Sequence, residues 1–410
     1  MLLLFACTDK TAPVDDTAAG DDTAPHESSV DDTAIASDDT ATVPTDDTAI
    51  DTDTDTAPPG CTTSCDCGDG ELCYEGTCAT AGPALDAYRD TLDRMLADMD
   101  PTTGEFPTEN SYPTETMMTF ASGAYLLCDD TLADAAETRA AYAIAETTSD
   151  HFYIPPGYGT IFRDVHARHI YNLWAAGHAL GDAALLAEAD AAAEAMLTLE
   201  RVVYKDEWTL FCVGYSSNAG HACDNGYTTI DVNQNSEIGL AFALLANDPE
   251  SALYQDPDAL DVVAQELGAA ISMQTAAGEI PLGSEGEHPK QYDTLYGSYA
   301  AWSWSNAVPI VTDPPLGTAA DLAAAWLAPL SDGDPQTQRY YPTTYEGDIS
   351  LSEGAMRLPV LSNAGVLDPA FLDYYWTVTV PEDTETETVW MPWWIPLHQG
   401  TPLADLIPPA

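Results

Sequence analysis

One pattern occurs five times between residues 113 and 366. In each copy a loop rich in Gly, Pro and aromatic residues ends in an acid, an apolar helical segment follows, and an Ala-rich amphipathic segment comes after a tight turn. The apolar segments begin at Thr114, Asp164, Asp231, Asp293 and Asp348. Because the long loop always precedes the apolar segment, stacked helical hairpins of this kind place all the long loops on one face. A ring of such hairpins has a funnel on that face, and we expect a functional site there.

The hydrophobic periodicity predicts eleven helices. We expect them at 84–99, 114–129, 131–149, 165–181, 183–200, 232–247, 258–275, 293–307, 318–330, 350–364 and 368–376. The second, fourth, sixth and eighth are apolar nearly all round, which is typical of helices buried on both sides, whereas their partners have one apolar stripe and one charged face. This alternation predicts an inner ring of helices wrapped by an outer ring, and the Trp-rich tail that starts at Trp390 is expected to help close it.

The alternation of helix types and loop lengths resembles the (α/α)-toroid, or six-hairpin, superfamily, which includes glycoside hydrolases, polysaccharide lyases and uronate epimerases. The resemblance covers residues 83–410. It implies an all-α, (α/α)6-like toroid that acts on a polysaccharide or oligosaccharide. An α-solenoid of helical repeats is the rival fold, but solenoids have loops of more even length.

The chain is strongly acidic, with 68 acidic and 11 basic side chains among 410 residues. A surface of this charge repels nucleic acid and anionic lipid, so neither is an expected partner. No apolar run reaches the ~18 residues that a transmembrane helix needs. The four residues Leu4-Phe5-Ala6-Cys7 resemble the lipobox of a bacterial lipoprotein signal, although the charged n-region is missing and the apolar run is short.

We therefore expect residues 1–7 to be the remnant of a lipoprotein signal, with a lipid on Cys7. The lipid would be the only contact with a membrane, and it would anchor the chain in the bacterial cell envelope, at the outer membrane or the cell surface. The alternative is an accidental match. Residues 8–60 contain five DDTA units and almost no large apolar side chains, so they predict a disordered acidic tether.

Residues 61–82 hold five cysteines, which in an exported chain predict a small disulfide-rich module. Zinc is the weaker interpretation, because exported thiols oxidise and no His lies nearby. The odd number calls for a sixth partner, and Cys128 is the expected one. Cys212 and Cys223 are expected to form a disulfide across one long loop.

Acids occupy equivalent positions at the starts of the inner helices: Glu115, Asp164, Asp231, Asp293 and Asp348. Helix capping is the simplest interpretation, since an Asp side chain there accepts from free N–H groups. The same positions face the predicted funnel, so Asp164, Asp231 and Asp293 are also candidate substrate-binding residues. Two such acids on facing helices would suit an inverting glycoside hydrolase, whose carboxyl groups lie about 6.5–9.5 Å apart.

Arg163, His166, Arg168 and His169 fall within seven residues of a chain that has few basic side chains. One interpretation is a structural salt bridge beside buried histidines. The other is an anion pocket, in which Arg163 or Arg168 binds a substrate carboxylate and His166 or His169 transfers a proton. We take the histidines as candidate catalytic residues and the arginines as candidate substrate-binding residues. No HExxH-like motif supports a zinc site, and no metal or cofactor is predicted.

The start of the next inner helix is rich in amides, which are poor helix formers. Capping is one explanation, and hydrogen bonding to sugar hydroxyls is the other. Asn233 is a candidate catalytic residue and Asn235 a candidate substrate-binding residue. Glu237 lies one turn deeper in apolar surroundings, where an unpaired carboxyl would have a raised pKa and act as a catalytic acid.

In polysaccharide lyases of the toroid class, an Asn, His or Arg neutralises the uronate carboxylate and a Tyr or His takes the C5 proton. By residue type, the resemblance implies Tyr292 or Tyr296 as such a base, although Tyr292, Tyr296 and Tyr299 at helical spacing also suit a core. Trp208 and Trp393 are candidates for stacking on sugar rings. The leading hypothesis is a cell-surface lipoprotein with a carbohydrate-active toroid, a lyase or uronate epimerase slightly ahead of a hydrolase. The alternative is a surface lipoprotein that binds a glycan or a protein partner without catalysis.

Overall fold

The computed structural model describes most of residues 60–328, together with Val360. The gaps within that range are 62–63, 69–70, 75–76, 81–82, 108–112, 156–158, 218–219, 224–227, 282, 284–293, 309 and 312–313. All described residues belong to one compact unit, Ala57–Ala410. Several predictions lie outside the described residues: the signal remnant with Cys7, the tether up to residue 59, the helix at 350–364 apart from Val360, the helix at 368–376, the tail that starts at Trp390, Tyr292, Asp293, Asp348 and Trp393.

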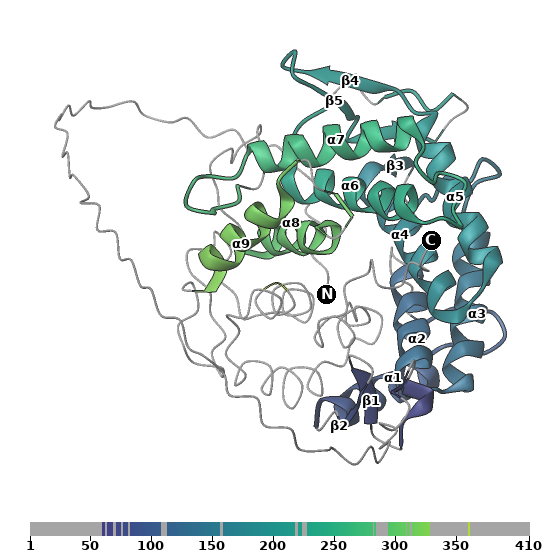
Figure 1. Ribbon diagram of the computed structural model, residues 1–410. Helices are drawn as coiled ribbons and strands as arrows, with labels where there is room; N and C mark the ends of the chain where they lie inside the picture. The colour runs from purple at the N-terminus through teal and green to yellow at the C-terminus, as the bar shows by residue number, and fades with distance from the viewer. Residues whose placement is uncertain are drawn as a thin grey trace, which may run out of the picture. The chain divides into compact units, whose positions relative to one another are not determined.

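The described residues form α-helical hairpins (Figure 1). The helices are α1 (Pro83–Asp98), α2 (Pro113–Leu127), α3 (Asp130–Ala145), α4 (Arg163–Leu180), α5 (Ala183–Leu197), α6 (Val232–Asn247), α7 (Pro257–Ser272), α8 (Thr294–Ala307) and α9 (Leu316–Leu327). Helices α2, α4, α6 and α8 pack side by side in that order, and α3, α5, α7 and α9 each pack against the helix before them. The predicted alternation of inner and outer helices is confirmed for these four hairpins.

Local sequence explains where the outer helices begin. Asp129, Asp182 and Asp256 occupy the N-cap positions of α3, α5 and α7, and each side chain accepts a backbone N–H of the first turn. The turn between α4 and α5 is tight because Gly181 adopts the left-handed conformation, with φ of 65°. The short turns keep each inner helix against its outer partner.

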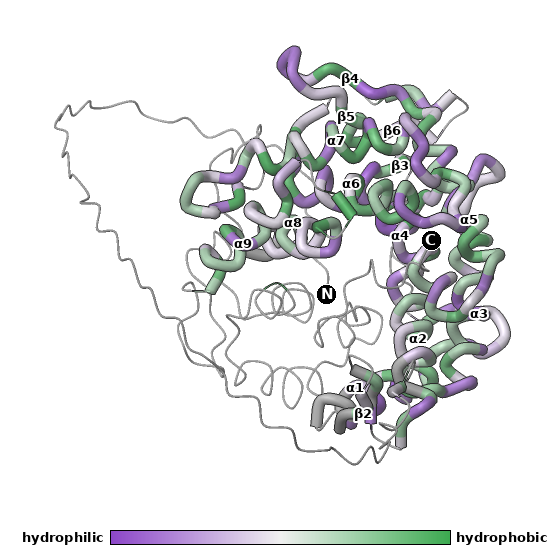
Figure 2. The backbone as a smooth tube through the Cα atoms, viewed as in Figure 1, coloured by the Kyte–Doolittle hydropathy of each residue, from purple (hydrophilic) through white to green (hydrophobic). Residues whose placement is uncertain are grey.

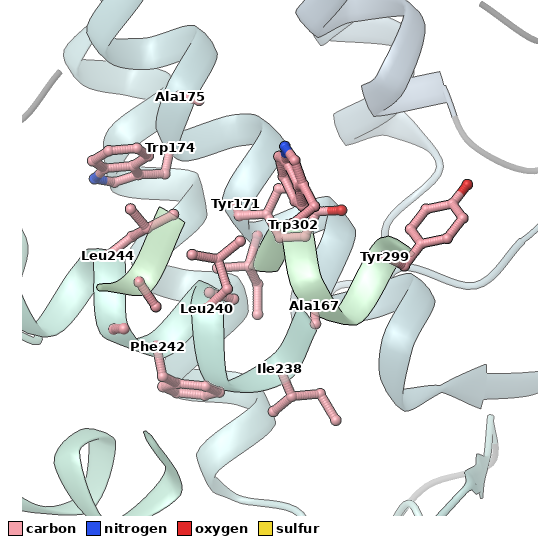
Figure 3. Packing of buried hydrophobic residues seen from close by; sticks show 14 of the residues in the cluster. Ala167, Tyr171, Trp174, Ala175, Ile238, Leu240, Phe242, Leu244, Tyr299 and Trp302 are labelled. Carbon is pink, nitrogen blue, oxygen red and sulfur yellow. The ribbon is translucent and has the colours of Figure 1, made fainter. Parts of the chain in front are cut away.

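The core fills the spaces between the helices. Trp174, Trp302 and Trp304 are fully buried on inner helices, and Figure 3 shows Trp302 of α8 beside Tyr171 of α4. Figure 2 shows hydrophobic residues along the helices that build this core. Gly239 lets α6 approach α7, because a Cβ at this position would lie 2.4 Å from Cγ of Leu267. Close helix contact therefore depends on small residues on the inner helices.

Short antiparallel strands, which the periodicity did not predict, occur in the loops: β1 (Glu71–Tyr74) with β2 (Thr77–Thr80), β3 (Thr160–Phe162) with β6 (Gly214–Ser216), and β4 (Arg201–Tyr204) with β5 (Trp208–Phe211). A single 3-10 turn, η1 (Ser64–Asp66), precedes β1. None of the helices in the described part of the chain combines the length and hydropathy needed to cross a membrane.

Four disulfides join the described cysteines. Cys61–Cys73 and Cys67–Cys78 lie within the module at 61–82, and Cys65–Cys128 ties that module to the end of α2. Cys212–Cys223 closes the long loop before α6. Cys128 is thus the partner of the fifth cysteine in the module, as the sequence predicts. In the described residues, the one group of ligand atoms spaced to hold a metal comprises Cys61, Cys67 and Cys78, and these thiols are oxidised.

Candidate active site

Four charged side chains from the first two turns of neighbouring inner helices converge. Nε and Nη2 of Arg168 on α4 donate to Oε2 and Oε1 of Glu237 on α6, at 2.7 and 3.2 Å. Nη1 of Arg168 lies 3.8 Å from Oε1 of Glu115 on α2, and Nη2 lies 3.7 Å from Oδ2 of Asp164. We call Glu115, Asp164, Arg168 and Glu237 the carboxylate cluster. They meet because Asp164 and Arg168, four residues apart, share one face of α4, between α2 and α6.

Burial dominates the electrostatics of the cluster. It raises the pKa of Glu115 to about 8 and the pKa of Glu237 to about 7, and the positive charge of Arg168 offsets only part of this effect. Glu237 accepts two hydrogen bonds from the guanidinium, whereas Glu115 is beyond hydrogen-bond distance of it. At neutral pH Glu115 therefore holds a proton, and Glu237 titrates close to neutrality.

Tyrosines surround the guanidinium of Arg168. Its Cζ lies 5.4 Å from the centre of the Tyr299 ring of α8, and Tyr171 lies one turn below Arg168 on the same face of α4. Burial raises the pKa of both phenols well above the ordinary value, so they stay protonated. Tyr296, a predicted catalytic residue, is 37% exposed, and its ring centre lies 6.5 Å from that of Tyr299. Figure 3 shows the buried Tyr171 and Tyr299.

Asn233 lies on the same face of α6 as Glu237, one turn nearer the start of the helix. Its side chain is mostly buried and makes no hydrogen bond within the described residues. Of the predicted site residues, the structure therefore brings together Asp164, Arg168 and Glu237, with Asn233 one turn away on the face of Glu237. Glu115 was predicted only as one of five equivalent acids at helix starts, and Tyr171 was not predicted as a site residue. The signal that identifies Tyr171 is its spacing of three residues from Arg168.

Arg163 does not face the cluster, which corrects its prediction as a substrate-binding residue. It is fully buried, and its guanidinium holds the loop that leads into α6. It donates to the carbonyl oxygens of Phe211 and Thr229, to Oε1 of Gln234 and to Oδ2 of Asp231. Asp231 occupies the N-cap position of α6, but its side chain makes no capping hydrogen bond and pairs with Arg163 instead, at 3.2 Å. The capping interpretation of Asp231 is therefore wrong.

The two histidines predicted as catalytic residues are fully buried away from the guanidinium face of α4. Nε2 of His166 bonds to the carbonyl oxygen of Ala192 on α5 at 2.9 Å, and Nδ1 accepts from the N–H of Tyr153 at 3.3 Å. The ring of His169 stacks on that of Tyr153, at 5.0 Å between centres. Burial lowers the pKa of His166 to about 4 and that of His169 well below its ordinary value. Both rings are neutral at pH 7, and neither makes a hydrogen bond to the carboxylate cluster in the described structure.

Two further candidates have other partners. Nδ2 of Asn235 donates to Oε2 of Glu266 on α7, and its Oδ1 accepts from the N–H of Asp231, so this amide joins an inner helix to an outer one. Trp208 lies on the β4–β5 hairpin and packs against Gly268 of α7. A Cβ added to Gly268 would lie only 2.6 Å from Cζ3 of Trp208. The amide of Asn235 is therefore engaged by other residues of the chain, whereas stacking of a sugar on the partly buried Trp208 stays a prediction.

No protein-family model and no curated protein sequence matches the chain. Solved structures do match by fold. They include a sugar epimerase from a ruminal bacterium (TM-score 0.56, 16% identity, 79% of this chain and 97% of that one). A cellobiose 2-epimerase from Spirochaeta thermophila has a TM-score of 0.55 at 13% identity, over 80% of this chain and 97% of that one. A β-1,3-1,4-glucanase from Paenibacillus sp. X4 has a TM-score of 0.56 at 13% identity, over 80% and 93%. The chain therefore has the (α/α)6 toroid fold shared by these carbohydrate-active enzymes.

Proposed function

We propose that the chain is a glycoside hydrolase that binds an uncharged saccharide at the first turns of α2, α4 and α6. The observation that carries the proposal is the pairing of two buried carboxyls, Glu115 and Glu237, around one guanidinium, with pKa values raised to about 8 and about 7. Acid–base cleavage of a glycosidic bond requires one carboxyl that is protonated and one that is ionised at the working pH, and two different pKa values near neutrality allow this.

Each carboxyl has a distinct role in this mechanism. Glu115 carries a proton at neutral pH and donates it to the glycosidic oxygen as the bond from that oxygen to the anomeric carbon breaks. The ionised form of Glu237, which Arg168 stabilises, takes a proton from the water that attacks the anomeric carbon. One water is consumed, Glu115 is left ionised and Glu237 protonated, and proton exchange with solvent at the two carboxyls restores the starting state. Tyr171 and Tyr299 stay protonated and hold the guanidinium face in place.

The charge of the site disfavours a uronate substrate. Arg168 is already bound to Glu237 and has two more carboxyls within 4 Å, at 3.7 and 3.8 Å. Arg163 is fully engaged by the loop before α6, and the two histidines are neutral. A substrate carboxylate would therefore meet net negative charge in the described part of the site. This contrasts with the lyase and uronate epimerase hypotheses, which rest on free Arg and His side chains.

The second candidate is a sugar epimerase, favoured by the likeness in fold to the two epimerases named above. Glu237 would then remove a proton from a carbon of the sugar rather than from water. The two reactions leave different products. Hydrolysis of neutral oligosaccharides gives new reducing ends, epimerisation in deuterium oxide gives a deuterium-labelled epimer, and a lyase gives unsaturated ends from uronans that absorb ultraviolet light.

The test is a product analysis of the purified full chain on a panel of neutral oligosaccharides and uronans. We expect reducing ends from neutral substrates, with loss of at least a hundredfold in kcat for Glu115→Gln and Glu237→Gln. Far-ultraviolet circular dichroism checks that both variants fold. A deuterium-labelled epimer would move the assignment to the second candidate. Saccharide binding without any product would support the non-catalytic alternative, and products unaffected by both substitutions would refute the roles given to these carboxyls.

We also propose that Cys7 carries the lipid expected from Leu4-Phe5-Ala6-Cys7. The four disulfides support an exported protein, because such bonds persist in oxidising compartments. Expression of the full chain in a bacterial host with labelled palmitate should put label in the protein and the protein in the membrane fraction. Cys7→Ser should remove both, and an unlabelled wild-type protein would refute the anchor.

A further inference from the structure

Buried polar atoms without hydrogen-bond partners gather at one place in the described part of the chain. The five such atoms are Oε1 of Glu115, Nδ1 and Nε2 of His169, Oδ1 of Asn172 and Nη1 of Arg201. Arg201 is accounted for by its ion pair with Asp261, at 2.9 Å. The remaining four all come from α2 and α4. Because most buried polar side-chain atoms in native proteins have a partner, a concentration of four at one helix contact points to a ligand between them.

Helix α4 carries His169 and Asn172, and it packs against α2, which carries Glu115. His169 and Asn172 are three residues apart on α4 and share a face. Nδ2 of Asn172 lies 3.4 Å from Oγ1 of Thr114, the residue before Glu115 on α2. Asn172 therefore reaches the turn of α2 that carries Glu115, from the face of α4 that also carries His169. We call His169, Asn172 and Glu115 the polar seam.

The chemistry of the seam restricts what can bind there. His169 is neutral, so one ring nitrogen donates a hydrogen bond and the other accepts one. Tyr153 covers the face of the ring and leaves both nitrogens at its edge. Oδ1 of Asn172 can only accept. A small uncharged molecule that both donates and accepts satisfies all of these atoms, and water is such a molecule.

We propose that the polar seam is a binding site for ordered water, which bonds to His169 and Asn172 and supplies the partner of Oε1 of Glu115. The seam is then a chain of hydrogen bonds that fixes the orientation of Glu115 from behind, while Arg168 approaches it from the side. Asn172 and His169 become positioning residues for the acid. This last consequence rests on the proposed function, whereas the presence of the water does not.

A crystal structure of the full chain at a resolution that shows ordered water tests the site directly. We expect a water within hydrogen-bond distance of Oδ1 of Asn172 and of a ring nitrogen of His169. If the side chains pack together there without water, the proposal is wrong.

Stability measurements give an independent test, because a hydrated and a dry seam predict different losses relative to a matched control. Asn172→Leu keeps the branched shape of the side chain and removes both its hydrogen bond to Thr114 and any bond to water. The matched control is Asn306→Leu, which removes a buried amide that donates to the carbonyl oxygen of Trp302 at 2.9 Å. If water bonds to Asn172, the substitution also leaves the other seam atoms without a partner, and Tm falls by about 2 °C or more beyond the loss in the control. A loss of Tm equal to or smaller than that of the control would contradict the water site.

The pH dependence of hydrolysis tests the link to Glu115. Other charged or titratable groups act on this carboxyl from neighbouring helices: Arg168 and Tyr171 of α4, Glu237 of α6 and Tyr299 of α8, while Asp164 faces Arg168. Asn172→Leu leaves all of them in place, so a shift of the basic limb of the profile by about half a pH unit or more reports the loss of the seam water. A basic limb identical to that of the wild type would refute the link. Ordered water in an inactive wild-type protein would leave the site standing and refute the proposed function instead.

Discussion

Replacement of Glu115 by Gln should make the fold several kcal/mol more stable at pH 8 and at most about 1 kcal/mol more stable at pH 5. Burial raises the pKa of this carboxyl from 4.5 to about 8, so the folded chain binds the proton more tightly than the unfolded chain does. For an acid of this kind, the free energy of unfolding falls as the pH rises from the pKa of the unfolded state to the pKa of the folded state. Glutamine has the same shape but cannot ionise, so the variant escapes this loss.

The magnitude follows from the interval between 4.5 and about 8. At 1.36 kcal/mol per pH unit, and with half of the groups ionised at pH 8, the wild type loses about 4 kcal/mol there relative to acid pH. Arg168 offsets only part of this effect of burial, because it donates two hydrogen bonds to Glu237 and lies 3.8 Å from Glu115. The gain for Glu115→Gln should therefore approach a few kcal/mol at pH 8.

Denaturant unfolding followed by tryptophan fluorescence, at pH 5 and pH 8, measures this gain. The matched control is Glu137→Gln on the exposed side of α3, which should change the free energy of unfolding by less than about 0.5 kcal/mol at both pH values. If Glu115→Gln is less stable than the wild type at pH 8, the ionised carboxylate is held favourably by its surroundings. In that case the raised pKa, and the role of Glu115 as a proton donor, would both be refuted.

Three other substitutions test separate parts of the structure. Arg163→Met should lower the free energy of unfolding by about 3–5 kcal/mol in urea titrations, since it leaves Asp231 and buried loop carbonyls without their donor. Gly239→Ala should cost about 1–3 kcal/mol, measured in the same way, because its Cβ would lie 2.4 Å from Cγ of Leu267. Tyr296→Ala should weaken saccharide binding about tenfold in calorimetric titrations, because an exposed ring beside the site can stack on a sugar. Tyr254→Ala, at a similarly exposed tyrosine after α6, should leave the affinity unchanged.

The helices were predictable because their signals are local. The range 232–247 predicted for the sixth helix equals that of α6, and the apolar residues of α6 reveal burial on both sides without knowledge of its neighbours. The strands were not predictable in the same way. β3 and β6 have three residues each and pair across more than fifty positions of the chain, so their existence depends on how the loops meet.

The site was predictable in part, because the sequence gives the angle of a residue on its helix but not the neighbour on that side. Arg163, His166, Arg168 and His169 are close in the sequence, yet they point to different partners. Arg163 reaches the loop before α6, His166 reaches α5, and Arg168 reaches Glu237. Because these residues are close in the sequence, a single anion pocket was predicted. The turn of the helix instead directs their side chains to three different neighbours.

The acids at the helix starts show which sequence feature distinguishes a helix-capping residue from a candidate site residue. Asp182 and Asp231 both occupy N-cap positions, Asp182 before α5 and Asp231 before α6. Asp182 follows a tight turn, where the free N–H groups of its own helix are the nearest donors, and it caps α5. Asp231 follows a long loop, which brings Arg163 within 3.2 Å, and Glu115 and Asp164 likewise lie near Arg168. An acid that begins a helix after a long loop is therefore the stronger candidate for a site, because the loop brings other chain segments, and their charges, to it.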